Sequence, residues 1–525
     1  MAVAAPATAA PVQARFAVPE WARRPWPLLA VGAVLVVAVA LRVGSLRNPP
    51  TDFHITRQYN GALLAHSYYA DLSPHTSHAD RVIASLDRPP VIEPPVLESM
   101  TVAVDLALGH ETLVFPRLVS VLAWALAGVA LWAIGRRLLG PLGALTAVGI
   151  FELLPFAVLA TRSFQPDPLA VAAMLLAVLL SFRWAEQPTP RRFAAAATGA
   201  GLAIILKADF APFVIAGHVA AGAMPAGRRS ARAMLRPAQA VWLAAAVVPA
   251  AVWSMFVSFS KLSVAQRIST YFIAHYLVTT AYWRHLGALL SGVFGPFVLV
   301  GAAAGLLLSR GRMRALLLWS AAAFGVFAIA FDFKVATHSY YQLPFIPFVA
   351  LAAACAVERV SRWVGGRGFS PVGQRCLAVA ALGLAAVIVV TQDRLPSPAR
   401  GREEVAAART VGAALCHPER AVFVDAAYGM PLEYHGDMAG TAWPSPGDIA
   451  FAALHGEKEP PATAELARLR TAGSRYVIVT DEVMLQAEPD LAAALGPYPQ
   501  TLSGPGYRVF DLDPAAPAHC AGGPG

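Results

Sequence analysis

Long apolar segments recur along the first three quarters of the chain, and they constrain its fold more than any other feature. A helix needs about 20 apolar residues to cross the hydrocarbon core of a bilayer. Only 14% of the residues are charged, against roughly a quarter in soluble proteins. The chain is therefore predicted to be a polytopic α-helical membrane protein, and an ordinary cytosolic enzyme is excluded. We place about eleven spans, at residues 26–45, 113–134, 141–160, 167–184, 193–207, 209–224, 238–259, 288–308, 315–331, 342–358 and 376–392.

Arginines mark one set of alternate loops, and acids gather in the other set. Because Lys and Arg collect in short cytoplasmic loops, the N-terminal tail, residues 1–25, is predicted to be cytoplasmic and disordered. The odd number of spans then places the C-terminus outside the inner (plasma) membrane. Topology accounts for the net charge of +9, so the expected surroundings are membrane lipids, and no nucleic-acid partner is expected. The basic loops include Arg136, Arg137, Arg183, Arg191, Arg192, Arg310, Arg312 and Arg314.

The apolar excess ends near residue 392, which separates a transmembrane domain, 26–392, from a C-terminal domain, 393–525. Helices are expected at 402–415, 463–471 and 491–495, and strands at 421–425, 476–480 and 507–511. Alternating elements of these lengths predict a small extracytoplasmic α/β domain. Cys416 and Cys520 lie in it, where oxidation is permitted, and either a disulfide or an unpaired thiol fits the sequence.

The loops predicted to lie outside contain most of the side chains that could do chemistry. The first, residues 46–112, is far longer than a connection needs, which is typical of a functional or a disordered loop. Carboxylates, cations, phenols and imidazoles converge on this face, as expected of a site for an anionic headgroup and a hydroxyl nucleophile. The candidates are Asp52, Arg57, Arg88, Glu93, Arg162, Asp167, Lys207, His275, Tyr340 and Tyr341.

Four features, in this order, resemble the glycosyltransferase C superfamily, in the branch with protein O-mannosyltransferases and lipid A aminoarabinose transferases. They are Asp52 directly after the first span, the Pro-Pro and Glu-Pro run at 88–95, Asp167 in the 162–167 loop, and the Ser-Tyr-Tyr-Gln-Leu-Pro entry to a late span at 339–344. The resemblance covers the membrane part and implies the GT-C fold. Members often have Asp-Glu after the first span, whereas His54 follows Phe53 here. Either His54 or Glu93 would then take the role of the missing acid.

Location restricts the donor, because nucleotide sugars are not expected outside the membrane. The predicted reaction moves a sugar from a polyprenyl-phosphate donor to an acceptor hydroxyl, with inversion of the anomeric carbon. Asp52 would accept the proton of the hydroxyl, and Asp167 would orient the acceptor or assist Asp52. The acceptor is a protein, a lipid or a polysaccharide. The donor phosphate would be bound by Arg57, Arg88, Arg162, Lys207, Tyr340 and Tyr341.

The resemblance also implies a divalent metal ion in some members, with Glu93 and His275 at the matching positions. One carboxylate and one imidazole are too few ligands to identify a metal.

Structural roles for the same residues stay open. Asp52 and Asp167 are suited to cap helices, and Lys207 is suited to anchor a helix at the membrane surface. His275, Tyr340 and Tyr341 fit an aromatic belt. The alternative function is a transporter or flippase of lipid-linked sugars, which would bind near the bilayer midplane and often shows inverted repeats.

Overall fold

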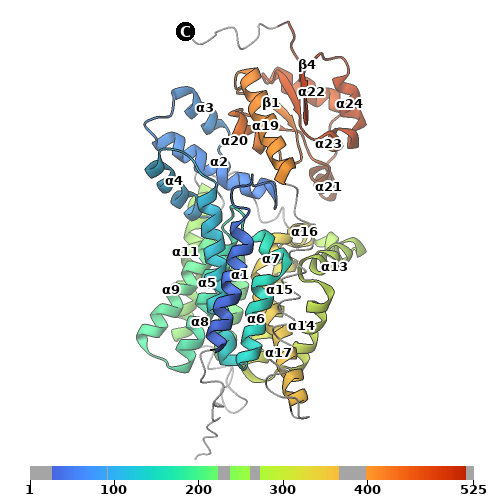
Figure 1. Cartoon of the computed structure of the whole chain (residues 1–525). Coiled ribbons are helices and arrows are strands. Elements are labelled where there is room, and N and C mark those ends of the chain that lie inside the picture. The colour runs from blue at the N-terminus through green and yellow to red at the C-terminus, as the bar shows by residue number, and fades with distance from the viewer. Residues whose placement is uncertain (1–25, 92, 223–236, 260–271, 366–397, 516–525) are drawn as a thin grey trace, which may run out of the picture.

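A bundle of helices forms the larger part of the molecule, and a C-terminal region stands on one end of it (Figure 1). The computed structural model describes residues 26–91, 93–222, 237–259, 272–365 and 398–515. We call the end that carries the C-terminal region the upper end and the opposite end the lower end.

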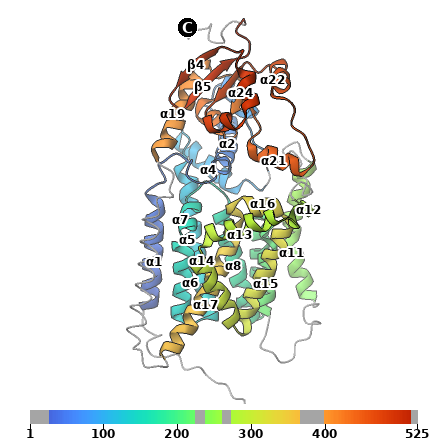
Figure 2. The same ribbon diagram turned by 90° about the vertical axis from the view of Figure 1, so that its right-hand side faces the viewer.

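Long apolar helices make up the bundle, and α1 stands at its edge (Figure 2). Shorter helices, α13 and α16 among them, lie across its upper end (Figure 2). The helices of the bundle are α1 (Trp26–Val43), α5 (Val114–Leu138), α6 (Pro141–Leu153), α7 (Pro155–Ala160), α8 (Asp167–Glu186), α9 (Pro190–Leu206), η2 (Ala208–Phe210), α10 (Ala211–Gly222), α11 (Pro237–Phe259), α12 (Ala274–Leu277), α13 (Thr280–Phe294), α14 (Pro296–Leu308), α15 (Gly311–Ala330), α16 (Asp332–Thr337), η5 (Ser339–Phe345) and α17 (Ile346–Gly365).

Six helices within the described ranges are long and apolar enough to cross a membrane, and a seventh is added if α13 and α14 count as one span. The protein is therefore a multi-pass membrane protein, but eleven spans are not confirmed. Pro155 starts a new helix directly after α6, and α13 and α14 meet at an angle of 96° at Gly295. Helix α10, at 12 residues, is shorter than the predicted span 209–224, and the predicted span 376–392 lies outside the described residues.

The first long loop folds into three helices that lie over the upper end beside the C-terminal region (Figure 1). They are α2 (Ile55–Leu72), α3 (His78–Leu86) and α4 (Val96–Leu108). His54 precedes α2 with a φ of +39°, in the left-handed region that residues other than glycine rarely adopt. This residue lies between Asp52 and the first turn of α2.

A five-stranded sheet forms the centre of the C-terminal region, in the order β2-β1-β3-β5-β4. Strands β2, β1 and β3 are parallel, whereas β5 and β4 are antiparallel to their neighbours. The expected elements are present, and further elements lie between them. Cys416 is disulfide-bonded, and Cys520 lies outside the described residues. The elements are α19 (Pro398–Leu415), β1 (Ala421–Val424), α20 (Met430–Gly436), β2 (Gly440–Ala442), α21 (Pro446–Leu454), α22 (Ala462–Thr471), β3 (Tyr476–Val479), α23 (Glu482–Ala487), α24 (Pro489–Leu495), β4 (Gln500–Gly504) and β5 (Tyr507–Asp511).

Helix α20 joins the C-terminal region to α2 through aromatic and polar contacts. The hydroxyl of Tyr59 lies 2.9 Å from Nε2 of His435. The ring of Tyr434 packs against the rings of Tyr59 and His66, with centroids 5.9 and 5.8 Å apart. His66 Nδ1 is in turn 2.9 Å from a carboxylate oxygen of Glu111. The C-terminal region is thus fixed directly to the first long loop.

Two carboxyl groups at this junction resist ionisation. Burial, aided by the carboxylates of Asp87 and Asp425, raises the pKa of Glu433 to about 9. Burial also raises the pKa of Asp87 to about 8, against the opposing effect of His66. Both groups are therefore mostly protonated at neutral pH, and raising the pH places two negative charges in a partly dry contact.

We expect the protein to lose thermal stability as the pH rises from 5 to 9. Carboxyl groups in an unfolded chain titrate near pH 4, so the folded protein binds more protons than the unfolded chain between that pH and about 9. The stability that these groups contribute is complete below pH 4 and is lost as the pH passes 8 to 9. Glu433→Gln should make the decline of the unfolding midpoint with pH shallower. Glu419→Gln, at an exposed position of the same region, is the control, and equal slopes for the two variants and wild type would contradict the assignment.

Helices α14 and α17 cross closely because glycine occupies the contact. A Cβ at Gly305 would lie 1.7 Å from the carbonyl oxygen of Ala352, where only a shift of one backbone can make room. A Cβ at Gly301, one turn earlier, would lie 3.5 Å from Cβ of Ala353, an ordinary contact. Small residues at such crossings let membrane helices approach each other.

Gly305→Ala should lower the thermal unfolding midpoint of the detergent-solubilised protein, whereas Gly301→Ala should not. The clash is with backbone, so we expect a cost at the upper end of the about 1–3 kcal/mol typical of overpacking. This exceeds the roughly 1 kcal/mol that alanine gains over glycine within a helix. Equal midpoints for the two variants would show that the helices are not packed as described.

Candidate active site

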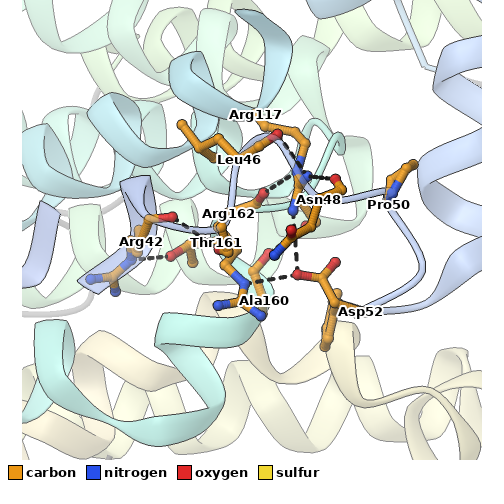
Figure 3. A network of polar contacts seen from close by, with 12 residues as sticks. Arg42, Leu46, Asn48, Pro50, Asp52, Arg117, Ala160, Thr161 and Arg162 are labelled. Carbon is orange, nitrogen blue, oxygen red and sulfur yellow. Dashed lines mark hydrogen bonds and ion pairs between the residues drawn. The ribbon is translucent and has the colours of Figure 1, made fainter. Parts of the chain in front are cut away.

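Asp52 lies just after α1 and is held by two arginines and an amide (Figure 3). Its Oδ2 accepts from Arg162 Nε at 2.8 Å and lies 3.3 Å from Arg117 Nη2. Its Oδ1 accepts from Gln58 Nε2 at 3.2 Å. These three contacts fix the orientation of the carboxylate. The side chain is 9% exposed, so a small part of it reaches the surface of the site.

Arg117, near the start of α5, ties together the loops around Asp52 (Figure 3). Its Nε donates to the carbonyl of Arg162 at 2.8 Å, and its Nη1 donates to the carbonyls of Leu46 at 3.0 Å and Asn48 at 2.7 Å. The side chain is fully buried. Because buried carbonyls need donors, one guanidinium satisfies three backbone groups and a carboxylate at once.

A second buried arginine, Arg42 at the end of α1, supports Arg162 from the neighbouring residue (Figure 3). Arg42 Nε donates to Oγ1 of Thr161 at 2.7 Å, and Nη2 donates to the carbonyl of Glu152 at 2.9 Å. The carboxylate of Glu152 lies 3.7 Å from Nη1. Glycine at position 128 leaves room for it, since a Cβ there would lie 2.3 Å from Oε1 of Glu152. This pair fixes the α6–α8 connection against α1.

The loop 88–95 and the ends of α8 and α9 bring a second charged cluster together. Glu93 accepts from Lys207 Nζ at 2.8 Å and from Arg57 Nη2 at 3.0 and 3.1 Å. Asp167 lies 3.4 Å from Lys207 and 3.7 Å from Arg57, and its side chain is fully buried. Asp209 is 3.9 Å from Lys207.

The two clusters have opposite charge balances. Three carboxylates surround Arg57 and Lys207, whereas the Asp52 carboxylate faces both Arg117 and Arg162. Burial alone would raise the pKa of Glu93, but the two cations outweigh it and hold the pKa at about 2. Glu93 is therefore ionised at any physiological pH.

Aromatic side chains from η5 cover the guanidinium of Arg57. Its Cζ lies 5.6 Å from the ring centroid of Tyr340, which packs against Tyr341 at 4.7 Å. His54 packs edge-to-face on Tyr340 at 4.9 Å, and its Nε2 lies 2.9 Å from Oγ of Ser339. Burial lowers the pKa of His54 to about 4, so the imidazole is neutral at pH 7. Of the two alternatives for the missing acid, only Glu93 carries a negative charge.

Two predicted site residues are not brought to these clusters. Arg88 pairs with Asp71 and donates from Nε to Ser67 at 3.1 Å, about three to four turns along α2 from Arg57. His275 is exposed on α12. Asp52, Arg57, Glu93, Arg162, Asp167, Lys207, Tyr340 and Tyr341 do lie in the two clusters.

The residues predicted to hold a metal do not fit one. Both oxygens of Glu93 accept from Arg57, and one of them also accepts from Lys207. In the part of the chain that the structure describes, no three His, Cys, Asp or Glu side chains lie close enough to hold a metal ion.

Sequence reasoning missed three residues that organise the site. Arg42 and Arg117 lie inside predicted spans, and Gln58 follows Arg57 without a motif to mark it. Gln58 Nε2 donates to the carbonyls of Pro50 and Phe53, and its Oε1 accepts from the amide of Phe164. A signal existed for the arginines, because each lies at the predicted outer end of a span, against the positive-inside rule.

The comparisons with known proteins agree with this architecture. A family model described as dolichyl-phosphate-mannose-protein mannosyltransferase matches residues 93–254. The crystal structure of ArnT from Cupriavidus metallidurans bound to undecaprenyl phosphate is similar, with a TM-score of 0.53, 16% identity and coverage of 93% of this chain and 98% of that chain. The apo structure of that protein has a TM-score of 0.50, 16% identity and coverage of 93% and 97%.

A cryo-EM structure of the arabinofuranosyltransferase AftD from Mycobacteria is also similar. Its TM-score is 0.51 at 14% identity, and the match covers 93% of this chain and 40% of that chain. No curated protein matches the sequence. At these identities the solved structures show the fold, and with the family model they confirm the predicted resemblance to the glycosyltransferase C superfamily.

Arg117→Lys should destabilise the protein although it keeps the charge. An ammonium group cannot reach four acceptors that a planar guanidinium serves from three nitrogens, so buried carbonyls lose their donors. We expect a loss of about 3–5 kcal/mol for Arg117→Met, which also leaves charge uncompensated, and a smaller loss for the lysine variant. The measurement is the thermal unfolding midpoint in detergent. Arg136→Lys, exposed on the same helix, should leave the midpoint unchanged, and a similar result for Arg117→Lys would refute the role of the guanidinium fork.

Proposed function

We propose that this protein is a membrane glycosyltransferase that moves a sugar from a polyprenyl-phosphate donor to an acceptor hydroxyl, with inversion. The observation that carries the proposal is the oriented carboxylate of Asp52, 9% exposed, beside an Arg57–Lys207 cluster at one end of the bundle. The fold shared with ArnT, crystallised with undecaprenyl phosphate, and the mannosyltransferase family model support it.

Asp52 is the general base of this reaction. Arg117, Arg162 and Gln58 hold its carboxylate in one orientation, so the oxygen that faces the site is already positioned for the proton of the acceptor hydroxyl. The deprotonating hydroxyl attacks the anomeric carbon from the face opposite the phosphate, which inverts the configuration. A positioned base contributes about 10²- to 10⁴-fold to the rate.

Arg57 and Lys207 receive the phosphate as it leaves. They bind carboxylate oxygens of Glu93 at 2.8 to 3.1 Å, and this contact with one anion supports an anion-binding role for them. The guanidinium of Arg57 is 17% exposed and therefore reachable. The ring of Tyr340 lies over this guanidinium and packs against Tyr341, and we assign their hydroxyls as neutral donors to the phosphate. Fixed donors in a partly dry site stabilise developing negative charge more than water does.

Asp167 acts by positioning Arg57 and Lys207 and does not bind the acceptor directly. Its carboxylate is fully buried and lies within ion-pair distance of both Arg57 and Lys207. We assign it the role of holding the two cations in place at the start of α8, so that their donors face the donor phosphate.

The upper end faces outward in this proposal, as the arginine distribution predicts. The donor is then a lipid-linked sugar that has been flipped across the plasma membrane, and the acceptor is a hydroxyl of a protein, a lipid or a polysaccharide. The transporter or flippase alternative is not favoured, since both clusters lie at helix ends and not midway along the helices.

Asp52→Asn should lower the transfer rate about 10²- to 10⁴-fold, because the amide cannot accept the proton. The assay supplies purified protein with labelled polyprenyl-phosphate sugars and membrane extract, and it follows the label into acceptor. The anomeric configuration of the product, compared with that of the donor, tests inversion directly.

The matched control is Asp80→Asn, which removes an exposed acid from α3 of the same loop. It should transfer sugar as fast as wild type. Unfolding midpoints of both variants separate a loss of chemistry from a loss of folding. Undiminished transfer by a folded Asp52→Asn protein would contradict the assignment of Asp52 as the base. Donor uptake without any glycosylated product would favour a transporter.

A further inference from the structure

A basic groove lies at the lower end of the bundle, far from the candidate active site. It is formed by the C-terminal ends of α5 and α8 and the N-terminal end of α9, and it encloses about 580 Å³. Its polar lining includes Arg137, Arg183, Glu186, Arg191 and Arg192. Four arginines and one glutamate give the groove a net charge of +3.

Two of the guanidiniums in the groove have no partner within the described ranges of the chain. Arg137 pairs with Glu186 at 3.2 Å, and Arg192 donates to the carbonyl of Arg183 at 3.0 Å. The guanidiniums of Arg183 and Arg191 line the cavity without a hydrogen bond or ion pair to another described residue. The groove therefore holds uncompensated positive charge.

Apolar side chains continue from the groove toward the middle of the membrane. On α8, Leu176 and Leu180 share a helix face with Arg183 at spacings of three and four residues, and Leu176 is 46% exposed. On α9, Leu202 lies on the face of Arg191 and is 57% exposed. Each helix thus has an arginine at the groove and lipid-facing apolar side chains above it.

The position along the helices matches the level of lipid headgroups. Helix α8 has 20 residues and begins at Asp167 in the Arg57–Lys207 cluster, so its axis spans about 30 Å, the thickness of a bilayer hydrocarbon core. Arg183 and Arg191 consequently lie at the opposite headgroup layer, which is cytoplasmic in the predicted orientation.

We propose that this groove binds the phosphate headgroup of an anionic membrane lipid. The guanidiniums of Arg183 and Arg191 bind the phosphate oxygens, because a planar guanidinium can donate two parallel hydrogen bonds to a phosphate. Arg192 adds a further positive charge. The acyl chains lie along Leu176 and Leu180 of α8 and Leu202 of α9. These apolar stripes favour a lipid over free phosphate, and basic pockets between helix ends on the cytoplasmic side are known to take such headgroups.

The test measures lipid binding by the intact detergent-purified protein with native mass spectrometry. The probes are phosphatidylglycerol, phosphatidylcholine and inorganic phosphate, each added separately. Wild type should retain phosphatidylglycerol in preference to phosphatidylcholine, and inorganic phosphate should not displace it. The double variant Arg183→Gln, Arg191→Gln should bind phosphatidylglycerol about thirtyfold more weakly, because each basic side chain at a membrane surface contributes roughly a factor of five.

The matched control is Arg310→Gln, Arg312→Gln, which removes two arginines from the same end of the bundle outside the groove. It should bind as wild type does. Should the groove double variant fail to fold, Arg191→Gln alone, at an exposed position, should weaken binding about fivefold. Equal loss in groove and control variants, wild-type binding by a folded groove variant, or displacement of the lipid by inorganic phosphate would each overturn the proposal.

Discussion

The ion pairing of Asp52 with Arg117 and Arg162 takes place where little water reaches, and the upper end of the bundle depends on it. Burying a charge is costly unless a partner and hydrogen bonds compensate for it. Here the carboxylate satisfies two guanidiniums, and Arg117 in turn satisfies carbonyls from the segment after α1 and from the segment before α8. Removing one of these side chains leaves the others without their hydrogen-bond partners, so the segments that approach the site are held together as a unit.

The division of charge between the two clusters follows from where each one obtains its residues. The Asp52 cluster takes its cations from α5 and the α7–α8 connection, whereas Glu93 comes from the Pro-rich segment of the first long loop. That loop therefore does more than cover the bundle, because it supplies both Arg57 and its carboxylate partner.

The sequence predicted which residues share a face, because alternate loops of a membrane protein meet on one side. This was enough to group Asp52, Arg162 and Asp167. It did not predict the pairing, since Arg117 looked like part of an apolar span and Arg88 gave no sign that Asp71 would bind it. Hydropathy also merges helices that proline and glycine separate, and so the predicted span 288–308 joins the second half of α13 to α14 across the bend at Gly295, which has a φ of +75°.

One turn of α2 connects the clusters to the C-terminal region. Arg57, Gln58 and Tyr59 are consecutive and therefore point about 100° apart around the helix. Arg57 reaches Glu93, Gln58 reaches Asp52, and Tyr59 reaches His435 of α20. A rotation of α2 cannot change one contact without changing the other two. The C-terminal region, whose sequence shows no catalytic motif, thus influences the site by fixing the rotation of the helix that both charged clusters share.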